Sequence, residues 1–234
     1  MKTRGLFWPF LLAALQLTGC SQPTTTDRGF LQPAFNPEKF HGDDVYEILP
    51  QTSEIRILVY RGGPLAGLGH NHVINTRDIR GKIYRHQELR HSGFVLQLPV
   101  HGFEVDNPAL RVAAGPAFAV MPSAKDIAGT RLNMLGEQVL NGKQHPTIHL
   151  ISVALSGNKS SLNALTRVTV RDISTDINIP VKVGFEDSDI IIKGQTGISQ
   201  TELGMKPFSI LMGAIAIQDK IIVQFDLVAR RADH

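Results

Sequence analysis

The feature that most constrains the fold is an alternation of apolar and polar side chains over several stretches of the chain. Successive side chains of an extended strand point to opposite faces, so this alternation gives each stretch one apolar face. The residues predicted to share such faces are Ile55, Ile57 and Val59, then Phe94, Leu96, Leu98 and Val100, then Ile177, Ile179, Val181, Val183 and Phe185, and finally Ile221, Val223, Phe225, Leu227 and Ala229.

Further strands are expected at 79–86, 147–156, 165–172 and 189–199, and a hairpin turning at 218–220 leads into the last strand. About eight antiparallel strands with one apolar face must protect their edges, and closure into a barrel does so. A two-sheet sandwich is the alternative. The predicted fold is therefore all-β with one helix, an eight-stranded antiparallel barrel that occupies residues 44–232.

The expected helix lies in the stretch "PSAKDIAGTRLNMLGEQVLN", which breaks the strand pattern. Ser123 is a candidate N-cap, with Asp126 three residues further on. Asn141-Gly142 is a typical helix end. The apolar residues that recur at roughly helical spacing are Ile127, Leu132, Leu135 and Val139.

The N-terminus has the pattern of an export signal. Lys2 and Arg4 precede the apolar run "LFWPFLLAALQL", which is too short and too interrupted for a membrane span. It ends in "LTGC", which resembles a bacterial lipobox, so we expect residues 1–19 to be removed and Cys20 to be lipidated. Cys20 is the only cysteine, which leaves no thiol for a disulfide or for catalysis. Ser21 at the next position favours the outer membrane over the inner one.

A Pro- and Thr-rich stretch at 20–43 is expected to tether the domain to the membrane. Loss of Lys2 and Arg4 with the signal leaves 22 basic side chains beside 21 acidic ones. A nearly neutral chain without a basic block does not indicate a nucleic-acid partner. The sequence also has no Gly-x-Ser-x-Gly, His-Glu-x-x-His or Gly-Lys-Ser/Thr motif, so we expect no enzyme.

The short run "AGLGHNHV" raises three possibilities for His70, Asn71 and His72. They could form a structural turn whose side chains bond backbone, or polar contacts at the mouth of a ligand cavity. They could also ligate a metal or haem, because two histidines two residues apart on an extended segment point the same way. A zinc site needs three or four protein ligands, and the spacing of the other histidines indicates no third one.

The second half of the chain resembles the YceI-like family. The stretch "GQTGISQTELGMKPFSILMGAIAIQDKIIVQFDLVARR" is similar to the C-terminal part of that family, and "GTRLNMLGEQVLNGKQHPTIHLIS" to its helix-to-strand passage. The resemblance covers about 45 to 231. The matching positions are Leu140, Pro146, Ile148, Ser152, Gly197, Ser199, Gln200, Leu203, Gly204, Pro207, Gly213 and Asp219.

This resemblance implies a lipocalin-like barrel of the periplasm that binds long isoprenoid lipids or quinones, without known catalysis in most members. The chain departs from the family pattern at Arg171-Asp172, where the family commonly has glycine, and its opening looks like a subgroup marked by GHNH. No other cofactor is implied.

A ligand-binding barrel needs an apolar interior, and flexible methionines suit such a lining. The residues expected to line the cavity are Phe94, Leu96, Leu98, Phe118, Met121, Met134, Phe208 and Met212. Three functions stay open at this point: a lipid-anchored protein that binds an apolar lipid, a metal- or haem-linked envelope protein using His70 and His72, and an interaction module with a packed interior. The oligomeric state is not indicated.

Overall fold

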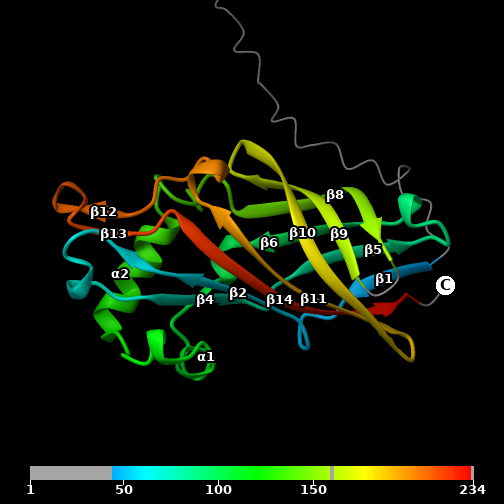
Figure 1. Cartoon of the computed structure of the whole chain (residues 1–234), viewed down its shortest axis with the longest axis horizontal. Coiled ribbons are helices and arrows are strands. Elements are labelled where there is room, and N and C mark those ends of the chain that lie inside the picture. Colours follow the sequence, from blue (N-terminus) through cyan, green and yellow to red (C-terminus); the bar gives the residue numbers. More distant parts are fainter. Residues whose placement is uncertain (1–43, 159–160, 233–234) are drawn as a thin grey trace, which may run out of the picture. The chain divides into compact units, whose positions relative to one another are not determined.

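The computed structural model describes residues 44–158 and 161–232, which form one closed barrel with two helices beside it (Figure 1). The predicted signal segment 1–19, Cys20 and the tether 20–43 lie outside the described residues. In the part of the chain that the structure describes, no helix has both the length and the apolar content needed to span a bilayer.

The barrel strands follow one another around the wall in antiparallel order, and the last strand pairs with the first. Their bounds are β1 (Asp44–Ile48), β2 (Glu54–Val59), β4 (His72–Thr76), β5 (Arg80–Arg85), β6 (Gly93–Pro99), β7 (Glu104–Val105), β8 (Thr147–Gly157), β9 (Ser161–Val170), β10 (Ile173–Glu186), β11 (Asp189–Ser199) and β14 (Lys220–Arg231).

Eleven strands make eight positions in the wall because three positions are occupied by split strands. Both β1 and β2 pair with the same edge of β14, β1 at 229–231 and β2 at 222–226. The next position holds β4, which pairs with β2, and β5, which pairs with β1. The position after that holds β7, which pairs with β4, and β6, which pairs with β5. The predicted eight-stranded antiparallel barrel is therefore confirmed, and the two-sheet sandwich is not what forms.

A buried serine, Ser53, bonds to β14 at the break between β1 and β2. Ser53 is fully buried, its hydroxyl donates to the carbonyl of Val228 at 3.2 Å, and the Val228 N–H donates back to the hydroxyl at 2.9 Å. Between β1 and β2 the backbone turns away from β14. The Ser53 hydroxyl takes the place of a backbone partner there, so the N–H and the carbonyl of Val228 stay hydrogen-bonded.

The predicted apolar faces mostly point into the barrel, with one exception. On β14, Ile221, Leu227 and Ala229 are buried, as alternation predicts. Phe185 was predicted to face inward, but it is 53% exposed near the hairpin between β10 and β11. Its ring instead lies under the guanidinium of Arg85, which is 5.4 Å from the ring centroid.

The main helix begins where predicted and ends earlier. α2 spans Ala124–Leu135, and Ser123 and Asp126 form the capping box. Gly136 then turns the chain into an extended conformation, so the helix ends well before Asn141. Leu132 was predicted on the apolar face but is 75% exposed.

The remaining elements are short. They are the helix α1 (Pro108–Ala113), the 3-10 turns η2 (Ala66–Leu68), η3 (Leu89–His91), η4 (Val100–Gly102), η5 (Pro116–Phe118), η6 (Thr201–Leu203) and η7 (Leu211–Gly213), and a separate three-stranded sheet of β3 (Arg61–Gly62), β12 (Ser209–Ile210) and β13 (Ile215–Ile217). This small sheet lies at the same end of the barrel as α2, away from the hairpin between β10 and β11 (Figure 1).

Candidate ligand-binding cavity

The barrel contains a cavity of about 200 Å³ that is partly open to solvent. Its lining comes from strands all around the wall, because alternate residues of each strand point inward. The lining is apolar except for Thr166, Thr196 and Gln200. The apolar lining of β2 consists of the residues that alternation predicted, Ile55, Ile57 and Val59.

Two of the three polar lining groups are engaged with backbone. The Thr166 hydroxyl donates to the carbonyl of Ala164 at 3.2 Å, and the Gln200 amide donates to the carbonyl of Gln218 at 2.9 Å. Within the described residues, the Thr196 hydroxyl has no hydrogen-bond partner, so it is open to a polar atom of a ligand.

Four of the eight predicted cavity residues line the cavity. They are Phe94, Leu96 and Leu98 on β6 and Met134 near the end of α2. The three β6 residues face inward because they alternate along one strand, and Met134 reaches the interior because α2 covers one end of the barrel.

The other four predicted cavity residues lie elsewhere. Phe118 is buried outside the barrel, in a second apolar cluster with Leu58 and Val73. Met121, Phe208 and Met212 lie in connecting segments, where they are exposed to 46%, 37% and 106%. The prediction that these four residues line the cavity was wrong. Their apolar side chains indicated an apolar environment, but they did not indicate whether it lies inside or outside the barrel.

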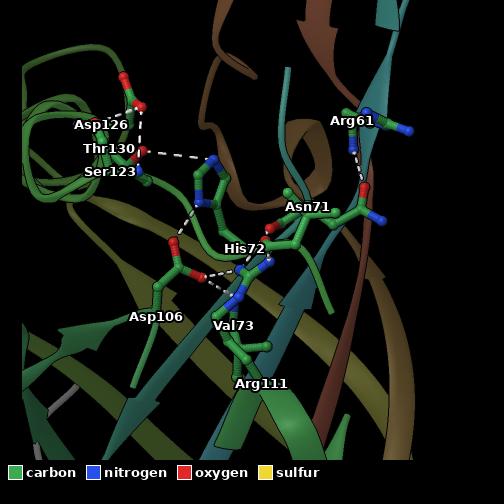
Figure 2. Close-up of polar contacts among 10 residues, drawn as sticks. Arg61, Asn71, His72, Val73, Asp106, Arg111, Ser123, Asp126 and Thr130 are labelled. Carbon is green, nitrogen blue, oxygen red and sulfur yellow. Dashed lines mark hydrogen bonds and ion pairs between the residues drawn. The ribbon is translucent and has the colours of Figure 1, made fainter. Parts of the chain in front are cut away.

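The GHNH run leads into β4, where Asn71 and His72 contact different parts of the chain (Figure 2). Asn71 makes the backbone bonds of a structural turn: its amide oxygen accepts from the Arg61 N–H at 2.9 Å, and its amide nitrogen donates to the carbonyl of Ala117 at 2.9 Å. The His70 ring is half-buried, with its centroid 6.2 Å from that of His72. Neither His70 nor His72 lines the cavity.

His72 is bound to a buried carboxylate that the sequence did not reveal. Its Nδ1 lies 2.6 Å from Oδ2 of Asp106, and its Nε2 lies 3.5 Å from the hydroxyl of Thr130 (Figure 2). The other Asp106 oxygen accepts from the backbone N–H of Val73 at 2.9 Å and from the guanidinium of Arg111. Both Asp106 and Arg111 are almost fully buried.

The Asp106 carboxyl is held ionised by this cluster. Burial alone would raise its pKa, but the hydrogen bonds from His72, the Val73 N–H and Arg111 together with the charge of His72 outweigh burial, and the pKa of Asp106 lies below its ordinary value. Arg111 also donates to the carbonyls of Asn71 and Val120. The cluster therefore ties β4 to α1 and to the segment before α2.

The contacts of His72 are relevant to the alternative that His70 and His72 ligate a metal ion. His72 directs Nδ1 to Asp106, which leaves Nε2 as its remaining nitrogen. Across residues 44–158 and 161–232, no three or more His, Cys, Asp or Glu side chains are grouped so that they could share a metal ion. Metal ligation by His70 and His72 thus gains no support from the described residues.

Sequence reasoning missed Asp106 and Arg111, and only a weak local signal marks them. Asn107-Pro108 is a typical helix start, and Asn107 caps α1 by accepting from the N–H groups of Ala109 and Leu110. Nothing in the sequence indicates that the acid before this cap would meet His72, which lies 34 residues away.

Comparison with known proteins places the fold. No family model matches the sequence, and no curated protein matches it. Among solved structures, BcnA from Burkholderia cenocepacia is similar with a TM-score of 0.57 at 11% identity, over 77% of this chain and 98% of BcnA. A polyisoprenoid binding domain from Saccharophagus degradans gives 0.54 at 8% identity, over 80% of this chain and 98% of that one.

A YCEI protein from Campylobacter jejuni is also similar, with a TM-score of 0.50 at 10% identity over 69% of this chain and 85% of that one. At these identities the comparisons establish a shared fold. The chain thus has the barrel architecture of YCEI and polyisoprenoid-binding proteins, as the sequence resemblance implied.

Proposed function

We propose that this protein is a lipid-anchored lipoprotein of the bacterial cell envelope whose barrel binds an isoprenoid-like lipid or a quinone. The observation that carries the proposal is the cavity inside the barrel, whose lining is apolar except for three side chains. Burial of apolar surface is the main favourable term for such a ligand. A similar fold in a polyisoprenoid binding domain supports the assignment.

The size of the cavity limits how the ligand is held. At about 200 Å³ it is smaller than the roughly 300–1,000 Å³ of typical ligand pockets. We therefore expect one segment of an isoprenoid chain to enter while lining side chains move aside. Met134 and Met205 are suited to this because their unbranched side chains adapt to irregular shapes.

The Thr196 hydroxyl supplies a donor for a ligand that carries a polar head. A quinone carbonyl beside it would accept a hydrogen bond inside an apolar cavity, where an unpaired polar atom is costly. A purely hydrocarbon segment would not use this group. A hydrogen bond from Thr196 would therefore favour a ligand with a polar atom inside the cavity, such as a quinone.

The anchor and the family assignment rest on the sequence. The lipobox "LTGC" supports lipidation of Cys20, and Ser21 supports an outer-membrane location facing the periplasm. The ordered motifs of the second half and the shared fold support membership of the YceI-like family, with GHNH marking a subgroup. Incorporation of a labelled fatty acid into the wild type but not into Cys20→Ser tests the anchor, and membrane fractionation tests the location.

The binding function is tested by organic extraction of the protein purified from its own membranes. Mass spectrometry of the extract should show one reproducible class of isoprenoid lipid or quinone in stoichiometric amount. Detergent-matched extracts of an unrelated lipoprotein from the same membranes serve as the control. An extract that does not differ from this control would reject lipid binding and favour a non-binding interaction module.

A further inference from the structure

Two neighbouring loops carry half of the large apolar side chains that are exposed in the part of the chain the structure describes, six of twelve. We call them the apolar tip. Its members are Leu65, Leu68, Phe208, Ile210, Leu211 and Met212. Scattered exposed apolar residues are ordinary, but a contiguous group of them marks an interaction surface.

The two loops of the apolar tip are held side by side by backbone contacts. β3 pairs with β13, and the Leu65 N–H donates to the carbonyl of Ala214 at 2.8 Å. Gly63 has a φ of 85°, and a Cβ at this position would come within 2.4 Å of the carbonyl oxygen of Gly213. This close approach requires glycine, so the loops form one defined surface.

The backbone of the apolar tip holds bulky side chains in an unusual conformation. Leu211 and Met212 have φ values of 49° and 53°, in the left-handed region that such residues rarely adopt. Met212 is fully exposed and Leu211 is 64% exposed. In water neither the conformation nor the exposure is favourable, so an apolar environment that receives these side chains would offset both.

The charges around the apolar tip are mainly positive. The segments 60–71 and 204–220 contain Arg61, Lys206 and Lys220 and one acidic residue, Asp219. The Asp219 carboxylate already accepts from the N–H and the hydroxyl of Thr201. Within the described residues neither Lys206 nor Lys220 forms an ion pair, and both are exposed. Exposed apolar side chains with an excess of cations in the same segments complement an anionic lipid surface.

The apolar tip also lies next to the cavity along the chain. Val59 lines the cavity and is followed directly by Tyr60 and β3. Ser199 pairs with Lys220 where β11 and β14 end, and both strands line the cavity further along. A surface that the apolar tip contacts would therefore lie against this end of the barrel.

We propose that the apolar tip inserts into the surface of an anionic lipid bilayer and so sets this end of the barrel against the membrane that holds the ligand. The purpose of this contact rests on the proposed lipid-binding function, whereas the contact itself rests on the apolar tip and its cations.

The test uses the full chain with Cys20→Ser, so that no acyl anchor holds it. An environment-sensitive fluorophore is attached either to Met212→Cys or to Phe185→Cys. Phe185 is the matched control because it is also an exposed apolar residue but pairs with Ile190 at the other end of β11. Both proteins keep the same N-terminal segment, so a difference between the labels reports the apolar tip.

With vesicles of phosphatidylethanolamine and phosphatidylglycerol, the label at 212 should shift to the blue and brighten several-fold, while the label at 185 stays unchanged. Lys206→Glu with Lys220→Glu should reduce the response at 212, as should vesicles of phosphatidylcholine alone. No response at 212, an equal response at both labels, or a shift at 212 on raising the protein concentration without vesicles would overturn the proposal, and the last result would indicate contact with a second copy.

Ligand content, measured by organic extraction, separates the two proposals. A protein that contains lipid but shows no response at 212 retains the binding function and loses the bilayer contact. A protein that shows a response at 212 but contains no extractable lipid retains the bilayer contact and loses the binding function.

Discussion

Asp106 is a buried carboxylate that joins three parts of the chain through His72, the Val73 N–H and Arg111. It has a φ of 58°, a conformation that aspartate tolerates better than most residues. Its partners are themselves buried, so the bonds form where water cannot replace them. A buried ion pair contributes little net stability compared with apolar packing, but removal of one partner leaves the other charge unpaired.

Asp106→Asn should therefore be strongly destabilising. Asparagine keeps the shape and tolerates the same backbone conformation, but it leaves Arg111 buried without its counter-charge, at a cost of roughly 3–5 kcal/mol in the free energy of unfolding. Urea denaturation measures this. Asp176→Asn is the matched control, since its partner Arg167 is exposed and such pairs contribute about 0–1 kcal/mol. Similar small losses for both variants would contradict the role assigned to Asp106.

The Asp106 carboxylate should also make the stability of the fold depend on pH. Because its pKa is lower in the folded state than the roughly 3.9 of an unfolded chain, the folded state binds fewer protons between the two values. The Asp106 contribution to stability is full above the unfolded pKa and is lost as the pH falls through the folded pKa. The difference in unfolding free energy between wild type and Asp106→Asn should shrink as the pH falls below about 4 through the folded pKa of Asp106. A difference that stays constant into that acid range would refute this linkage.

The helix α2 shows how a local sequence signal sets an element boundary. The Ser123 hydroxyl accepts from the Asp126 N–H at 3.2 Å, and the Asp126 carboxylate accepts from the Ser123 N–H at 3.3 Å. These reciprocal bonds satisfy donors at the helix start that would otherwise have no partner within the helix. Met134 on this helix reaches the cavity, so the cap also fixes one part of the lining.

Ser123→Ala should lower the unfolding free energy by about 1 kcal/mol, because it removes the N-cap acceptor. A thermal or urea unfolding series detects a change of this size. Ser156→Ala provides the comparison, because Ser156 is exposed on β8 and its hydroxyl has no hydrogen bond within residues 44–158 and 161–232. Equal stability of the two variants would argue against the capping role.

The sequence predicted elements well where the signal was local and repeated. Alternation located the inward faces of β2, β6 and β14, and the capping box located the start of α2. It did not predict the splits between β1 and β2 or between β4 and β5, since these depend on which edge each half pairs with. The six-residue α1 is too short to show helical periodicity.

Arg171 has a backbone conformation that is unusual for a residue with a side chain. Arg171 has a φ of 58° in the turn between β9 and β10, a conformation for which glycine is better suited. Arg171 belongs to the pair Arg171-Asp172, where the sequence departs from the pattern of the family it resembles. The candidate lining was harder to predict, because Phe94 and Phe118 are alike in sequence and only the closed wall decides which one faces the cavity.

In the whole molecule, each feature has a separate place. The wall surrounds the apolar cavity, the polar cluster of His72, Asp106 and Arg111 joins β4 to α1 outside it, and the apolar tip follows the strand ends at the end where the small sheet lies (Figure 1). A barrel that binds an apolar ligand as proposed would shield that ligand from water. The proposed binding function depends on the cavity.

The most direct measurement compares two equal substitutions on opposite faces of the wall. Ala164 is 2% exposed and lines the cavity, whereas Ala154 is exposed on the neighbouring strand β8. Ala164→Phe should fill the cavity and abolish most of the isoprenoid lipid or quinone that co-purifies with the protein, while Ala154→Phe should leave it unchanged; Ala164→Leu should give an intermediate loss. Cooperative unfolding of each variant verifies the fold. Equal lipid content in Ala164→Phe and Ala154→Phe, with both folded, would show that the ligand does not bind inside the barrel.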